Sequence, residues 1–251
     1  MQLTGNTLLI TGGGSGIGRG LAEALHRLGN QIIIAGRRQA VLDAVTAANP
    51  GMKAVALDIE DPANIAEVAS AIIREFPKLN GVINNAGIMR IEDVCKGAVA
   101  DAEAIVTTNL LGPIRLTAAL IPHFLAQRSA TIINVSSGLA FVPLAFTPTY
   151  CATKAAIHSY SQSLRYQLKD SGVKVLEIAP PWVATELMGA TPDDPRAMPL
   201  ADFIEETLSL LATDADEICV KRVLPLRNAA VGGYEAAVFK SFNDGMASRP
   251  H

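Results

Sequence analysis

The sequence predicts an α/β fold in which a doubly wound parallel sheet carries helices on both faces. Short apolar runs alternate with longer helical patterns, and no internal repeat or break in composition divides the chain. Strands separated by helices of this length pair in parallel, and right-handed crossovers place the helices on the two faces of the sheet. With 49% apolar and 18% charged residues, the chain can bury a sizeable core. We therefore expect residues 1–251 to form a single domain.

Each expected element follows from its pattern. Strands are expected at 7–12, 31–36, 53–58, 80–87, 130–137 and 173–180. Helices are expected at 15–28, 39–48, 62–75, 101–127 and 149–170. The irregular, proline-rich segment 186–202 follows the sixth strand, where a loop lies over the ligand crevice of an open sheet. The segment 215–251 is less regular: 216–226 is compatible with a strand, and 234–244 reads as a helix.

Composition and charge exclude several classes of protein. Nucleic-acid binding goes with an excess of positive charge, and the net charge here is −3, so no nucleic-acid partner is expected. The mean hydropathy is +0.28, but no apolar run approaches the ~20 residues of a membrane span. The N-terminus lacks the pattern of a signal peptide, and Cys95, Cys151 and Cys219 fit reduced thiols. We expect a cytoplasmic protein without a metal site, because neither the cysteines nor the scattered histidines have ligand spacing.

A glycine-rich turn joins the first strand to the first helix. The stretch TGGGSGIGRG (11–20) has glycines that allow a tight turn, a close approach to a diphosphate, and packing of helix on strand. A helix N-terminus there supplies free N–H groups and partial positive charge. A glycine-rich turn without a ligand is the alternative. The dinucleotide-binding residues expected here are Gly12, Ser15, Gly16, Ile17 and Gly18.

The end of the second strand predicts which cofactor binds. A site for NAD usually has a carboxylate at the position of Gly36, which binds the ribose 2′-hydroxyl. Here Gly36 is followed by Arg37 and Arg38, and guanidinium groups bind phosphate well. We expect NADP(H) to be favoured over NAD(H), the alternative being two solvated arginines at the start of a helix.

The third and fourth strands end in further candidate cofactor contacts. Asp58, followed by Ile59, could accept a hydrogen bond from the adenine amino group, or it could cap the following helix. Asn85, Ala86 and Gly87 would keep the backbone close to the cofactor, although a glycine here could also serve a simple turn.

The pentapeptide YCATK places Tyr150 and Lys154 on one face of a helix. An ammonium near a phenol favours the phenolate, so we expect a lowered Tyr150 pKa and a usable proton donor or acceptor. A half-exposed tyrosine beside a solvated lysine is the alternative. Asn109 precedes Pro113 by four positions inside a helical pattern, and proline removes an intrahelical hydrogen bond. We expect a bent helix with a backbone acceptor free for water, or else a mere kink.

Taken together, TGGGSGIG, NNAG, Asn109, NVSS, YCATK and PPWVAT resemble the short-chain dehydrogenase/reductase family in its compact form. The resemblance implies a Rossmann fold and a catalytic tetrad of Asn109, Ser137, Tyr150 and Lys154. Ser137 is chosen over Ser136 because the serine of the family lies 13 positions before the tyrosine. The resemblance implies that Ser137 binds the substrate carbonyl, Tyr150 transfers the proton and Lys154 holds the ribose. It implies that Asn109 anchors a water.

The resemblance also implies contacts after the sixth strand. Pro180, Val183 and Thr185 match positions that contact the cofactor, whereas Pro181 stands where relatives usually have glycine. Pro181 therefore shapes this wall of the nicotinamide site differently. Trp182 either lines the pocket or packs in the core. The expected substrate contacts are Ser137, Leu139, Tyr150 and Trp182.

The resemblance implies an NADP(H)-dependent oxidoreductase acting on a small carbonyl or alcohol substrate. A non-catalytic dinucleotide-binding sensor and an envelope-pathway partner protein are the alternatives. The unusual C-terminal part looks similar to a branch labelled as oxidoreductases of D-alanyl teichoic acid esterification. Relatives often pair their ends to build tetramers, so this departure favours a homodimer through helices 101–127 and 149–170.

Overall fold

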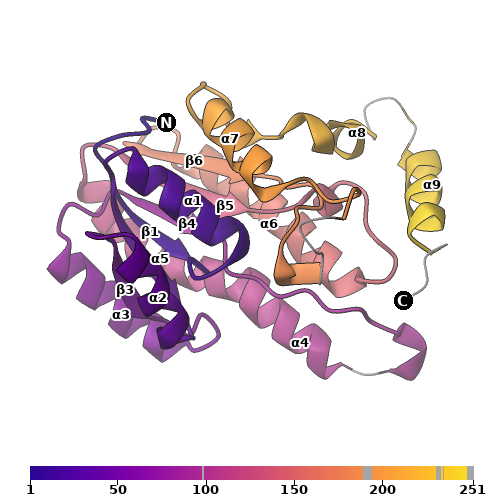
Figure 1. The fold of residues 1–251 in the computed structure, drawn as a ribbon, viewed down its shortest axis with the longest axis horizontal. Helices are drawn as coiled ribbons and strands as arrows, with labels where there is room; N and C mark the ends of the chain where they lie inside the picture. Colours follow the sequence, from indigo (N-terminus) through magenta and orange to yellow (C-terminus); the bar gives the residue numbers. More distant parts are fainter. Residues whose placement is uncertain (98, 189–193, 230–232, 234, 248–251) are drawn as a thin grey trace.

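The predicted doubly wound sheet with flanking helices is confirmed (Figure 1). It has seven parallel strands in the order β3-β2-β1-β4-β5-β6-β7. The computed structural model describes residues 1–97, 99–188, 194–229, 233 and 235–247. Within these residues the strands are β1 (Thr7–Thr11), β2 (Gln31–Gly36), β3 (Lys53–Ala56), β4 (Gly81–Asn84), β5 (Ala130–Val135), β6 (Val173–Ile178) and β7 (Glu217–Ile218).

Helices cover both faces of the sheet, which is why its central strands are apolar throughout. Leu8 and Ile10 of β1 point into one core with α1, α2 and α7, whereas Leu9 points into the other core with α3 and α5. The helices are α1 (Gly16–Arg27), α2 (Gln39–Ala48), α3 (Pro62–Glu75), α4 (Ala100–Val106), α5 (Gly112–Ala126), α6 (Pro148–Gln167), α7 (Leu200–Leu211), α8 (Leu224–Arg227) and α9 (Glu235–Ala247).

The strand order reverses at β1, which lies between β2 and β4. In such sheets a crevice opens beyond the carboxyl ends of the strands at the reversal. The turn after β1 enters this crevice, and the N–H of Gly12 donates to Ala35 O at 2.8 Å. Gly12 has a φ of 67° and Gly16 a φ of 52°, a left-handed backbone that glycine adopts without strain.

The long helix expected over 101–127 is interrupted at the place where Pro113 predicts an irregularity. A π-helical segment, Thr107–Leu111, separates α4 from α5 and has Asn109 at its centre. By length and composition alone, Ala100–Ala126 could cross a membrane. In this fold, however, Leu116, Leu120 and Phe124 of α5 are fully buried against the sheet, as in a core helix.

The expectation of a strand over 216–226 is correct only for its first residues. β6 pairs with β7 up to Ile178, but Pro180 and Pro181 follow and lack the N–H groups that extend a ladder. The Lys221 N–H instead donates to Glu206 Oε1 of α7 at 2.7 Å, and the chain enters helical turns. The helix expected over 234–244 corresponds to α9. Of the expected loop 186–202, residues 189–193 lie outside the described residues, and α7 begins at Leu200.

Replacing Gly18 with alanine should destabilise the fold. A Cβ at Gly18 would lie 2.4 Å from Gly12 O and 2.4 Å from Asn85 Nδ2, so the turn would have to move away from α1. Overpacking of this kind costs about 1–3 kcal/mol. Urea unfolding of Gly18→Ala should show this loss. The control is Gly36→Ala, whose Cβ would meet only Leu42 Cδ2 at 3.7 Å. Equal stability of the two variants would contradict the prediction.

Candidate active site

A cavity of about 830 Å³ runs along the carboxyl edge of the sheet, from the glycine-rich turn to α6 and α9. It gathers residues from across the sequence because parallel strands all end at this edge. All the sequence-predicted cofactor, catalytic and substrate residues line the cavity except Gly18, Asp58 and Asn109.

The turn after β1 fits an anionic ligand. Ser15 is the N-cap residue of α1 but makes no side-chain capping bond, which leaves the first-turn N–H groups for another acceptor. A side chain at Gly12 would collide with Asn85 Nδ2 at 2.8 Å and with the backbone of Ala86. Thr11 holds the facing segment, because its Oγ1 accepts from the N–H groups of Asn85 and Ala86, both at 3.0 Å.

The two arginines after β2 differ in their surroundings. Both line the cavity, but Arg37 is already ion-paired, with its Nη1 2.9 Å from Glu60 Oε1. Glu60 also accepts a hydrogen bond from Thr108 Oγ1 at 2.8 Å. A ligand phosphate would therefore share Arg37 with Glu60, whereas no hydrogen bond or ion pair of the Arg38 side chain occurs among the described residues.

Asp58 does not line the cavity, and its contact with the adenine amino group stays a prediction. Its Oδ1 accepts the Glu60 N–H at 3.0 Å. Asp58 does not cap the next helix, because Asp61 does so by accepting from the Ala63 N–H at 2.8 Å. Its neighbour Ile59 lines the cavity in its place.

Ser137, Tyr150 and Lys154 lie together on one wall of the cavity. The Ser137 hydroxyl lies near enough to the Tyr150 hydroxyl to favour the phenolate and so to oppose the rise of the Tyr150 pKa that burial causes. Lys154 Nζ donates to Val135 O at 2.8 Å and lies 5.5 Å from the centre of the Tyr150 ring. Ser136 Oγ is used elsewhere, because it donates to Glu177 Oε1. The geometry therefore favours Ser137 over Ser136 as the serine that meets a substrate.

The expected lowering of the Tyr150 pKa is wrong for the protein alone. Burial raises the pKa of Tyr150 well above its ordinary value, and the Ser137 hydroxyl opposes this only in part. Burial also lowers the pKa of Lys154 to about 8, against the charge of Glu177, which raises it. Desolvation disfavours the charged form of each group, and the spacing of the two residues in the sequence carries no information on burial.

Asn109 is buried, does not line the cavity, and fixes the segment after β4. Its Oδ1 accepts the Ile88 N–H at 2.8 Å, and its Nδ2 donates to Ile88 O at 2.8 Å. Nδ2 also lies 3.4 Å from Thr153 Oγ1 of α6. The side chain thereby joins the π segment to two neighbours of the site. Its role in holding a water stays a prediction.

Helix α9 contributes residues to the cavity that sequence reasoning missed. Phe242 and Met246 line the cavity and pack with the cluster around Leu144 and Tyr150. Asn243 fastens the helix by donating from Nδ2 to Pro143 O at 3.0 Å. The apolar residues one turn apart signalled a packed helix, but nothing in the sequence indicated what it packs against.

Trp182 lines the cavity, as one of its two interpretations predicted, and its ring lies under the guanidinium of Arg196 at 4.8 Å. Pro181 lines the same wall. The Gly138 N–H donates to Pro180 O at 2.8 Å, which ties this wall to the Ser137 loop.

Known proteins show the same organisation. Residues 6–196 match the sequence model of the family described as short chain dehydrogenase. The chain is 39% identical to the oxidoreductase DltE of Bacillus subtilis (strain 168) over 250 residues, which is 97% of this chain and 98% of DltE.

Solved structures agree with this match. A short chain dehydrogenase from Burkholderia cenocepacia in complex with NADP has a TM-score of 0.84 at 26% identity, over 96% of this chain and 98% of that one. The 3-ketoacyl-(acyl-carrier-protein) reductase of Brucella melitensis, complexed with NADH, has a TM-score of 0.79 at 26% identity, over 88% of this chain and all of that one. The fold, the arrangement of the cavity and the sequence match lead to one conclusion: the chain belongs to the short-chain dehydrogenase family.

Proposed function

We propose that the chain is an NADP(H)-dependent oxidoreductase that interconverts a carbonyl and an alcohol, with Tyr150 as the general acid or base. The observation that carries the proposal is that Ser137, Tyr150 and Lys154 lie together on the wall of a cavity that also contains the glycine-rich turn.

The residues present fit a dinucleotide. The uncapped N-terminus of α1 and the backbone around Gly12 suit a diphosphate, and Asn85 to Gly87 keep the facing wall flat. Arg37 and Arg38 suit a 2′-phosphate, and Gly36 offers no carboxylate to repel it. When bound, the nicotinamide supplies or accepts the hydride. Relatives complexed with NADP and with NADH support a nicotinamide cofactor in general, and the arginines support the preference for NADP(H).

The proton is the part of the reaction that this chain supplies. In reduction, the carbonyl carbon gains a hydride while its oxygen takes the Tyr150 proton, and Ser137 donates a hydrogen bond to that oxygen. The raised pKa keeps Tyr150 protonated, which suits the donor role. Lys154 as a cation stabilises the phenolate left behind, and solvent then returns the proton.

The walls around Tyr150 favour an apolar substrate. Leu139, Leu144, Phe242 and Met246 all line this end of the cavity. A moderately apolar aldehyde, ketone or alcohol would bury its chain against them. We place this reaction in the cytoplasm, carried out by a homodimer that pairs through the helical stretch α4–α5 and through α6. Both assignments rest on the sequence.

Tyr150→Phe should abolish turnover without loss of cofactor. Removal of the proton donor is expected to lower kcat/KM by about 10²–10⁴ in an NADPH-consumption assay over a panel of carbonyl compounds. Quenching of the single tryptophan, Trp182, should report unchanged NADPH binding. Tyr160→Phe on the same helix is the matched control and should stay active. A wild-type protein that binds NADPH and turns over none of the panel would favour a non-catalytic sensor.

The arginine pair should set the preference between cofactors. In Arg37→Ala/Arg38→Ala, kcat/KM for NADPH should fall by about 10–100-fold, since each charge-assisted bond to phosphate contributes ~1.5–3 kcal/mol. The value for NADH should change little. Arg74→Ala, an exposed change on α3, serves as the control. A wild-type enzyme that prefers NADH strongly would refute the assignment.

Helix α9 should affect the binding of larger substrates. Phe242→Ala removes apolar contact area above Tyr150, so KM should rise several-fold for a long-chain aldehyde, with less change for a short one. Phe239→Ala is the control, because Phe239 is 40% exposed on the same helix and does not line the cavity. Equal effects of the two changes would argue against contact between α9 and the substrate.

A further inference from the structure

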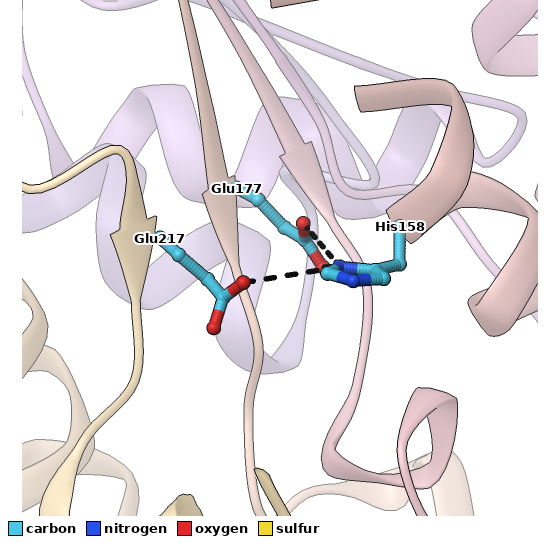
Figure 2. Close-up of side chains that lie close together, drawn as sticks. All are labelled: His158, Glu177 and Glu217. Carbon is cyan, nitrogen blue, oxygen red and sulfur yellow. Dashed lines mark hydrogen bonds and ion pairs between the residues drawn. The ribbon is translucent and has the colours of Figure 1, made fainter. Parts of the chain in front are cut away.

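A second polar cluster lies next to the catalytic wall, between α6 and the sheet. His158 projects from α6 toward Glu177 of β6 and Glu217 of β7 (Figure 2). None of these three residues lines the cavity. Their side chains have no part in the proposed reaction, yet Glu177 is fully buried. A buried carboxylate is costly and calls for a physical explanation.

Glu177 is held by groups next to the catalytic residues. His158 Nδ1 lies 2.8 Å from Oε2 and 3.0 Å from Oε1, and it must donate because a carboxylate only accepts. Ser136 Oγ donates to Oε1, and Ser136 directly precedes Ser137. Among the described residues, no lysine or arginine forms an ion pair with Glu177. Its hydrogen bonds are made, but its charge is not neutralised by a contacting guanidinium or ammonium.

The negative charge of Glu177 acts on the ammonium of Lys154. Lys154 and His158 are one turn apart on the same face of α6. Lys154 Nζ donates to Val135 O, and Val135 pairs in register with Ile178, the neighbour of Glu177. The ammonium is thus fixed to the strand beside the one that carries the carboxylate, and both groups lie in the dry interior, where charges interact strongly.

Two other titratable groups lie near Glu177: His158, which hydrogen-bonds to it, and Arg227. Arg227 is ion-paired with Glu217. Burial, together with the charge of Glu217, raises the pKa of Cys219 to about 12 and keeps that thiol neutral. The groups that face Lys154 and Glu177 are Tyr150 and His158 from α6, Glu217 and Cys219 from the β7 segment, and Arg227 from α8.

We infer that Glu177 is a positioning residue that holds Lys154 in its ammonium form and, through Ser136, fixes the strand end that carries Ser137. The inference rests on the proposed function, because it assigns Glu177 a part in preparing the same site. Burial lowers the pKa of Lys154 to about 8, and Glu177 is the group that raises it. Without Glu177, Lys154 loses its proton closer to neutral pH, and the Tyr150 phenolate loses its stabilising charge.

A cation at the cluster is the competing explanation. The ligand atoms of His158, Glu177 and Glu217 all lie within 4.8 Å of one another. Each carboxylate, however, already has protein partners: Ser136 and His158 for Glu177, and Arg227 for Glu217. The guanidinium of Arg227 supplies the positive charge that a bound cation would otherwise bring.

The direct test is a pH titration of Lys154 by NMR in protein carrying ¹³C-labelled lysine, without cofactor. The signal that disappears in Lys154→Arg is assigned to Lys154. In Glu177→Gln, which keeps the shape of the side chain, the titration midpoint should fall by about one pH unit. Glu177→Asp keeps the charge and should return the midpoint toward the wild-type value.

The matched control is Glu217→Gln, which removes an equal charge from the next strand. Its Lys154 midpoint should stay near the wild-type value, because Arg227 neutralises Glu217. An unchanged midpoint in folded Glu177→Gln, or an equal fall in Glu217→Gln, overturns the inference. So does a stoichiometric metal ion in the purified wild-type protein that is lost in Glu177→Gln.

A kinetic measurement connects the inference to catalysis. In Glu177→Gln, the fall of kcat/KM at high pH should begin about one unit lower than in the wild type, since Lys154 must be protonated. A purely structural role for Glu177 would lower activity equally at all pH values and would contradict the inference. If the wild-type protein reduces no carbonyl compound, the proposed function fails, but the NMR midpoint still decides the role of Glu177.

Discussion

The buried ammonium of Lys154 is the constraint on which the rest of the site depends. It is 5% exposed and donates to Val135 O at the carboxyl end of β5. A buried charge is tolerated only where it is hydrogen-bonded and compensated, so this contact fixes the rotation of α6 against the sheet. Tyr150 lies one turn before Lys154 on the same face and is thereby directed at the cavity. The hydroxyl of Ser137, two residues after Val135, then lies within reach of Tyr150.

The π segment at Asn109 also holds α6 in place, through Thr153. The Asn109 side chain, at the centre of this segment, bonds both the N–H and the C=O of Ile88 and reaches Thr153 of α6. The segment after β4 and the helix that carries Tyr150 are therefore held by the same side chain, which fixes two sides of the cavity relative to each other.

The sequence predicted the sheet and most of the cavity lining, because both depend on local patterns. Periodicity indicates strands and helices, and parallel strands bring their ends to one edge. Contacts between residues that are far apart in the sequence were not predicted. The pairing of Glu177 with His158, the contact of Phe242 with the Tyr150 cluster, and the ion pair of Arg37 have no short-range signature. The direction of the Tyr150 pKa was missed for the same reason, since burial belongs to the assembled fold.

Desolvation shifts the pKa values of the two ionisable groups of the site in opposite directions, and both shifts favour the neutral form. It raises the pKa of Tyr150 and lowers that of Lys154, so each is driven toward its neutral form. A neutral phenol is a ready proton donor, but a neutral amine cannot stabilise the phenolate that donation leaves. The site therefore needs a negative charge that keeps the amine protonated without touching the phenol. Glu177 is hydrogen-bonded to Ser136 and to His158, which lies one helical turn after Lys154, so its charge is placed to have this effect.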